Sequence, residues 1–184
     1  MRYYLLLFSF LLACKPDEVV KNAAIRVSDS VQTKDYTNTD DSLIKFDAPA
    51  FNDYPVKDTY DGTMAKAKLY PCTYARRYRT AIRETYQAEK VNFAGHYCFV
   101  YWGCGSPCQM AAIVDATTGM VYEAPPAGLG YDFYQSSNLL IVNPPHAHMT
   151  FNNNKEGYYL SHCPYCKPEA WVWKEKSKKF VQIK

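Results

Sequence analysis

Cysteine is the residue type in this chain with the widest chemical repertoire, and the sequence contains 7 of them. Six follow residue 70, at Cys72, Cys98, Cys104, Cys108, Cys163 and Cys166. An even number of cysteines is typical of a disulfide framework in an exported domain. The short spacings favour local closure of Cys104 with Cys108 and of Cys163 with Cys166. We then expect Cys72 to pair with Cys98 as a long-range link.

A redox role is the first alternative for these cysteines. The segment Cys163-Pro164-Tyr165-Cys166 is identical to the active-site motif of glutaredoxins. In that fold the motif opens a helix after the first strand, whereas only 18 residues follow Cys166 here and they predict a hairpin. The glutaredoxin fold cannot be built from this position. A different scaffold could still use the pair, because the CxxC spacing can lower the pKa of its first thiol.

Metal binding is the second alternative. Two turns with paired cysteines, at 104–108 and 163–166, could form a four-thiolate zinc site if they meet. Imidazoles could join sulfur ligands to hold copper or zinc, and the candidates are His146, His148 and His162. The spacing fixes no third ligand, so we expect neither a metal nor another cofactor.

The sequence contains no nucleophile, base and orienting residue at the spacing of a known hydrolase motif. We therefore expect a binding protein rather than an enzyme. The candidate binding surface is the aromatic and glycine-rich turn from Trp102 to Cys108, with His96 behind it. This hypothesis requires Tyr101 or Trp102 to be exposed near the turn.

The N-terminus predicts export and lipid attachment. A basic Arg2 is followed by an apolar run from Tyr3 to Leu12, which is too short to span a bilayer and is typical of a signal peptide. The segment Leu11-Leu12-Ala13-Cys14 resembles the bacterial lipobox, in which the cysteine is acylated and the preceding peptide is removed. The resemblance implies cleavage after residue 13 and anchoring of Cys14 in a membrane of the cell envelope.

Residues 14–42 predict a flexible acidic tether, because they are polar and offer little to bury. The start Lys15-Pro16-Asp17-Glu18 resembles a tract that directs some lipoproteins to the outer cell surface; a simple solvated linker is the alternative. We expect the outer membrane as the location, on its periplasmic or its surface side. The net charge of +3 at pH 7 gives no concentrated basic face for nucleic acid.

Residues 43–184 predict a single α+β domain. Tyr74, Tyr78, Ile82 and Tyr86 recur every four residues and indicate one amphipathic helix over 74–89, with Thr73 as its N-cap. Beyond Val91 the period changes to two, and six or seven strands follow. Residues 97–102 predict a buried central strand, while 110–123 and 171–183 predict hairpins. We expect the helix to pack on one antiparallel sheet.

Several motifs together resemble a group of bacterial exported proteins of uncharacterised activity. The segments that carry the resemblance are Asn92–Tyr97, Trp102–Cys108, Asp115–Gly119, Arg79–Arg83 and Leu139–Asn143, with Phe46 and Tyr54–Val56 before them. The likeness covers most of the domain and implies a shared fold without a mechanism. Cys98, Cys163 and Cys166 are not part of the common pattern, which favours a stabilising role for them.

These observations predict a lipid-anchored, disulfide-stabilised protein that binds an unknown protein or envelope ligand. Two alternatives remain open. One is a thiol-disulfide or metal-handling protein that uses Cys163, Cys166, His146 and His148. The other is an immunity or inhibitor protein.

Overall fold

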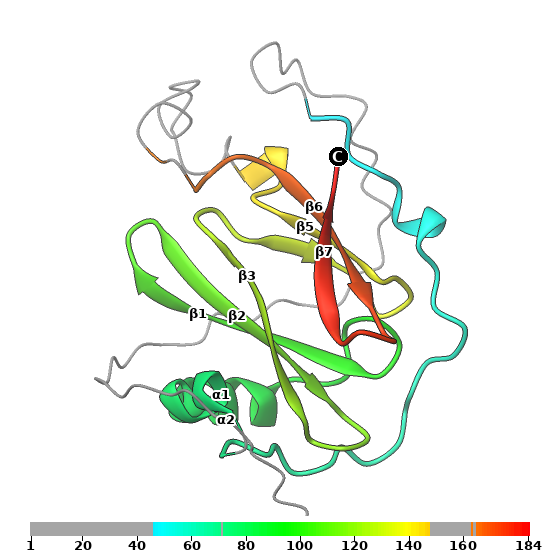
Figure 1. Cartoon of the computed structure of the whole chain (residues 1–184), viewed down its shortest axis with the longest axis vertical. Coiled ribbons are helices and arrows are strands. Elements are labelled where there is room, and N and C mark those ends of the chain that lie inside the picture. The colour runs from blue at the N-terminus through cyan, green and yellow to red at the C-terminus, as the bar shows by residue number, and fades with distance from the viewer. Residues whose placement is uncertain (1–45, 71, 148–162, 164) are drawn as a thin grey trace, which may run out of the picture.

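The computed structural model describes residues 46–70, 72–147, 163 and 165–184. The predicted signal peptide, Cys14 and the tether therefore lie outside the described residues. The described part is rich in β-structure, with few helices, as the period-two patterns predicted (Figure 1). In chain order its elements are η1 Phe51–Asp53, α1 Thr73–Arg77, α2 Arg79–Ala88, β1 Tyr97–Gly105, β2 Cys108–Asp115, β3 Val121–Ala127, β4 Tyr131–Phe133, β5 Leu139–Val142, β6 Glu169–Lys174 and β7 Lys179–Ile183.

The seven described strands form two antiparallel sheets rather than the single sheet predicted. The first sheet has the order β1-β2-β3 and the second has the order β4-β5-β6-β7. The chain passes between them after β3, where Gly130 adopts a φ of 106° that favours glycine. The strand β3 continues through Pro125 and Pro126, which its position at a sheet edge permits because an edge strand can leave one row of N–H groups unpaired.

The main core lies between the two sheets and is mostly aromatic. Phe99 and Ile113 of the first sheet belong to the same hydrophobic cluster as Leu140 and Trp173 of the second. The opposite face of the first sheet is covered by α1 and α2, through Ala75, Ile82 and Tyr86 among others. The outer face of the second sheet is covered by the segment that includes Phe46, Phe51 and Tyr54 (Figure 1).

The strand β1 is buried on both faces from Tyr97 to Val100, whereas burial was predicted as far as Trp102, and it is an edge strand and not a central one. A buried edge must find partners for backbone groups that no neighbouring strand supplies. Asn92 provides them: its Oδ1 accepts from the Phe99 N–H at 2.6 Å, and its Nδ2 donates to the Phe99 carbonyl at 3.3 Å. One side chain thus takes the place of a strand neighbour.

The predicted helix is present as two segments. Tyr78 departs from helical geometry, with φ −104° and ψ 20°, and separates α1 from α2. The hydrogen-bond ladder nevertheless continues, since the Ile82 N–H donates to the Tyr78 carbonyl at 3.0 Å. The predicted Thr73 cap is wrong by one residue: Cys72 is the N-cap, and its Sγ accepts from the Ala75 N–H at 3.3 Å.

The two predicted hairpins are confirmed. In the β2–β3 turn, Asp115 Oδ1 accepts from the Thr117 N–H at 2.8 Å and from the Thr118 N–H at 3.2 Å, as an Asx-type turn requires. Gly119 has a φ of 75°, and a Cβ there would collide with the Lys66 carbonyl oxygen. The turn therefore fixes the end of the first sheet against the preceding loop.

Candidate functional site

His96 is the predicted binding residue that the structure places on an accessible polar surface. It immediately precedes β1, and its carbonyl accepts from the Ala116 N–H at 2.9 Å, which ties it to the β2–β3 turn. Its imidazole lies on the ring of Tyr97, with 4.3 Å between centroids. Its Nε2 is 3.9 Å from Glu175 Oε1, in the turn between β6 and β7.

Glu175 is the centre of a hydrogen-bonded group that joins the two sheets. We call the group the Glu175 cluster; its members are His96, Tyr97, Trp173, Glu175 and Lys178. Glu175 Oε2 accepts from the Tyr97 hydroxyl at 2.8 Å and from Trp173 Nε1 at 2.9 Å. Lys178 Nζ donates to the Tyr97 hydroxyl oxygen at 2.7 Å and forms an ion pair with Glu175 Oε1.

The protonation states of the cluster follow from these contacts. Burial alone would raise the pKa of Glu175, but the hydrogen bonds from Lys178, Trp173 and Tyr97 outweigh it and hold the pKa below its ordinary value. Burial raises the pKa of Tyr97, and its hydrogen bond to the Glu175 carboxylate raises it further. At neutral pH Glu175 is therefore a carboxylate and Tyr97 is a neutral phenol.

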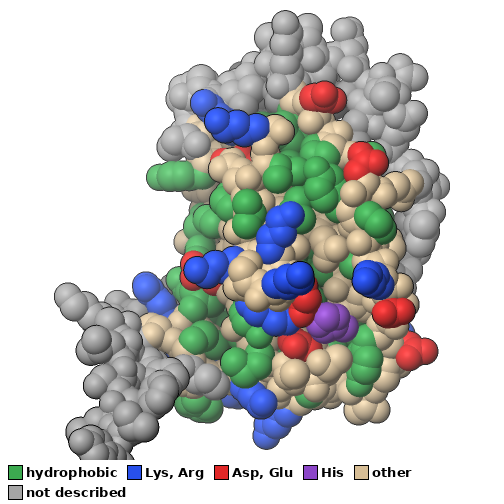
Figure 2. Space-filling view, turned by 45° about the vertical axis from the view of Figure 1, so that its right-hand side comes forward, with side chains coloured by type: hydrophobic (Ala, Val, Ile, Leu, Met, Phe, Trp, Pro, Cys, Tyr) green, Lys and Arg blue, Asp and Glu red, His purple; other side chains and the backbone are tan. Residues whose placement is uncertain are grey.

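The cluster is suited to recognising a polar ligand. The side chains of His96, Lys178 and Glu175 are 30%, 36% and 51% exposed, whereas Tyr97 is fully buried beneath them. Figure 2 shows a face of the molecule on which a histidine lies among basic and acidic side chains. The arrangement can accept hydrogen bonds from a polar ligand and donate hydrogen bonds to it.

Of the three residues of the predicted binding surface, His96 belongs to the Glu175 cluster, whereas Tyr101 and Trp102 lie farther along β1 toward the hairpin tip. Tyr101 follows His96 by five residues and Trp102 by six, which corresponds to about 17 Å and about 20 Å at roughly 3.3 Å per strand residue. Both are also only partly exposed and point to opposite faces. Tyr101 packs into the core between the sheets beside Tyr131, while Trp102 packs on the helices beside Tyr78 at 5.1 Å between centroids.

Two of the three predicted disulfides are present. Cys104 is bonded to Cys108, and Cys163 is bonded to Cys166. The predicted link between Cys72 and Cys98 is wrong, because both are free thiols although they belong to the same hydrophobic cluster. Cys72 caps α1 instead, and burial raises the pKa of the Cys98 thiol, so that it behaves as an apolar core residue.

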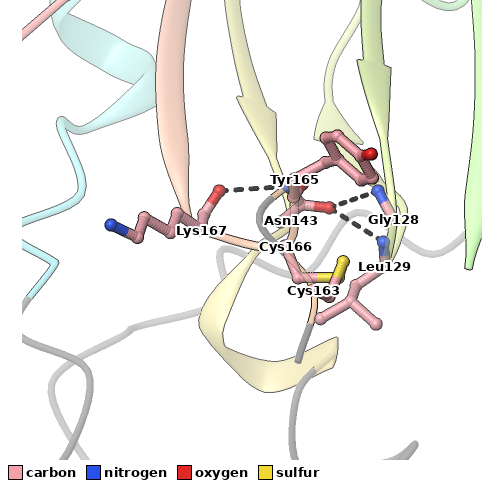
Figure 3. The surroundings of a disulfide bond; sticks show 7 residues. All are labelled: Gly128, Leu129, Asn143, Cys163, Tyr165, Cys166 and Lys167. Atoms are coloured by element: carbon pink, nitrogen blue, oxygen red, sulfur yellow. Dashed lines mark hydrogen bonds between the residues drawn. A yellow bond between two sulfur atoms is a disulfide. The ribbon is translucent and has the colours of Figure 1, made fainter. Parts of the chain in front are cut away.

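The Cys163–Cys166 disulfide is buried. Cys163 is 3% exposed and Cys166 is not exposed at all. Figure 3 shows the sulfur atoms close to the turn at Gly128 and Leu129. A Cβ at Gly128 would lie 2.5 Å from Cys166 Sγ, so only glycine lets this turn approach the disulfide. A thiol-exchange role for this pair requires an accessible Cys163, which the packing does not provide.

Asn143 holds the disulfide turn in place. It adopts a φ of 52° and is buried. Its Oδ1 accepts from the N–H groups of Gly128 and Leu129, each at 2.8 Å. Its Nδ2 donates to the carbonyls of Tyr165 and Lys167 at 2.6 and 3.0 Å (Figure 3). One buried amide thus satisfies four backbone groups in two loops, which points to a structural role for the CPYC segment.

Of the three histidines predicted as metal ligands, His146 lies within the described residues, where its Nδ1 is 3.5 Å from Asp132 Oδ2. His148 and His162 lie outside the described residues. Within the described ranges, no three side chains of the histidine, cysteine, aspartate and glutamate types are grouped as metal ligands. The four cysteines of the zinc hypothesis are used in two disulfides instead.

Glu175 and Lys178 are the site residues that the sequence analysis missed. They lie in a lysine-rich turn, and such turns usually serve solubility. Their spacing of three residues with opposite charge was a usable signal. Their long-range partner Tyr97, 78 residues from Glu175, could not be inferred from it.

Comparison with known proteins finds no matching family model, no matching curated protein and no matching solved structure. In the part of the chain that the structure describes, no helix has the length and apolar character needed to cross a membrane.

The pH dependence of stability tests the Glu175 cluster. The variant Glu175→Gln removes the charge that pairs with Lys178. We expect its free energy of unfolding to be lower by about 1 kcal/mol at pH 7, a small value because the ion pair is partly exposed to solvent. Because the pKa of Glu175 is lowered by folding, its contribution is complete above its ordinary pKa of 4.5 and is lost as the pH falls through the folded value. The free energy of unfolding, measured with urea, should therefore differ less between Glu175→Gln and the unmodified protein at pH 3 than at pH 7.

The matched control is Glu169→Gln, since Glu169 also accepts a hydrogen bond from an indole two residues away, that of Trp171 at 2.9 Å. At pH 7 this control should lower the free energy of unfolding by less than Glu175→Gln does. An equal loss in both variants, or a loss in Glu175→Gln that does not depend on pH, would contradict the role given to the cluster.

Proposed function

We propose that this protein is an exported lipoprotein whose domain binds a protein or another ligand of the bacterial cell envelope without catalysing a reaction. The observation that carries the proposal is the pair of disulfides within one domain. Disulfides persist in oxidising compartments and are rare in the cytosol, so both bonds favour a destination outside it. Each disulfide closes a short loop, so the two bonds stiffen local turns at two separate places in the fold.

The proposed anchor is an acylated Cys14. Its support is the lipobox-like segment ending in Ala13-Cys14, after a short apolar run with a basic start. Several acyl chains on one cysteine would give stable attachment, because two hydrophobic anchors already suffice. The polar tether of residues 14–42 would then hold the domain away from the lipid surface, at the periplasmic or the outer face of the outer membrane.

The proposed binding surface is the Glu175 cluster. Its rim offers an imidazole, an ammonium group and a carboxylate that are held by a buried tyrosine and a buried tryptophan. Rigid, preorganised polar groups lose little conformational freedom on binding, which favours recognition of a polar surface. An immunity or inhibitor protein would be a special case of this proposal, distinguished by the identity of its partner.

Replacement of Cys14 tests the anchor. The variant Cys14→Ala should remain unacylated and move from the membrane fraction to the soluble fraction, because it lacks the thiol that carries the lipid. Mass spectrometry of the N-terminal peptide and fractionation of cell envelopes measure the two effects. The control Cys72→Ala leaves Cys14 in place and should stay in the membrane fraction. Membrane retention of Cys14→Ala, or a mature protein that starts at another residue, would refute the anchor.

Site-specific photocrosslinking in intact cell envelopes tests the binding surface. A photoreactive amino acid at Lys176, which is exposed beside the cluster, should give a discrete adduct with an envelope component. The same amino acid at Arg83, exposed on α2, is the matched control and should not give that adduct. Adding His96→Ala should weaken the adduct at Lys176. An adduct formed equally from both positions, or one insensitive to His96, would exclude the cluster as the binding surface.

A further inference from the structure

The two disulfides of this chain differ in their access to solvent. Cys163 and Cys166 are enclosed by Leu129 and by the backbone at Gly128. Cys104 is exposed, and Cys108 is partly exposed, at the tip of the β1–β2 hairpin. A disulfide exchanges only when a thiolate can reach one of its sulfur atoms, so access decides which bond reacts. The exposed pair, and not the CPYC pair, meets that condition.

The hairpin tip leaves space for an approaching thiolate. Gly103 and Gly105 flank Cys104, both are exposed, and a Cβ built on either would meet no heavy atom within 4 Å. Ser106 is exposed as well. The pairing of β1 with β2 is irregular between Gly103 and Gly105, so Cys104 lies where the ladder is already interrupted. Reduction of the Cys104–Cys108 bond would therefore change the conformation of a hairpin tip that lies outside the main core.

We propose that Cys104–Cys108 is a site of reversible thiol-disulfide exchange and that its partner is a dithiol protein. The thiolate of the partner attacks Sγ of Cys104, the more exposed residue of the pair, and Cys108 leaves as a thiolate that takes up a proton. The second thiol of the partner then attacks the mixed disulfide, which releases Cys104 and closes a disulfide in the partner. Two electrons pass from the partner to this protein, and the reverse sequence restores the bond.

This inference does not rest on the Glu175 cluster or on the acylation of Cys14. The hairpin tip and His96 are at opposite ends of β1, so the tip can open without loss of the cluster. The core residues of β1 begin at Tyr97, and the burial pattern changes from buried to exposed along the strand toward the tip. The reduced protein should thus stay folded.

Competing reduction of the two bonds in one molecule tests the proposal. The purified, oxidised protein is treated with limiting dithiothreitol under native conditions, quenched with N-ethylmaleimide at intervals and mapped by peptide mass spectrometry. We expect Cys104 and Cys108 to become labelled at least about tenfold faster than Cys163 and Cys166. Denaturation in urea should bring the two rates together, which shows that the difference comes from folding. Equal rates in the native protein, or faster reduction of the buried pair, would overturn the proposal.

A trapping experiment tests the partner class and the point of attack. A reduced thioredoxin whose resolving cysteine is replaced by serine should form a mixed disulfide with this protein at Cys104. The double variant Cys163→Ser, Cys166→Ser should retain this adduct, and the double variant Cys104→Ser, Cys108→Ser should lose it. No adduct with the unmodified protein, or an adduct that maps to Cys163 or Cys166, would contradict the inference.

Discussion

The structure depends on the first half of β1, Tyr97 to Val100, which is buried on both faces. Successive residues of β1 alternate between the core shared by the two sheets, which receives Tyr97 and Phe99, and the core beneath the helices, which receives Cys98 and Val100. Both cores therefore form only if this strand is in register. Because it is an edge strand, it also needs the Asn92 side chain to satisfy the Phe99 backbone.

The two ends of β1 have different chemical character. One end places Tyr97 beneath a charged group held by Glu175, where the surface is rigid and polar. The other end extends beyond the core as an exposed hairpin tip closed by Cys104 and Cys108. A single strand thus connects the proposed binding surface at one end with the proposed exchange site at the other. The second disulfide is placed differently, because Asn143 and the Gly128 turn enclose it.

Local features of the fold were predictable from the sequence, and long-range ones were not. The turn at Asp115–Gly119 follows from residues that bond one another directly, and the helix follows from a repeat of four. The division into two sheets does not follow from the sequence, because an alternation of apolar residues predicts a strand but does not identify the strand that pairs with it. The free state of Cys72 and Cys98 and the link from Tyr97 to Glu175 depend on three-dimensional packing in the same way. The packing of Tyr101 and Trp102 on opposite faces of β1 does follow from the strand prediction, since adjacent strand residues point to opposite faces.

The most direct test of the account is disulfide mapping of the protein isolated from its cells, with free thiols blocked before digestion and without reduction. The account predicts peptides that link Cys104 to Cys108 and Cys163 to Cys166, together with unlinked Cys72 and Cys98. Free thiols at all six positions would contradict residence in an oxidising compartment. A bond between Cys72 and Cys98 would contradict the packing of β1 against the helices.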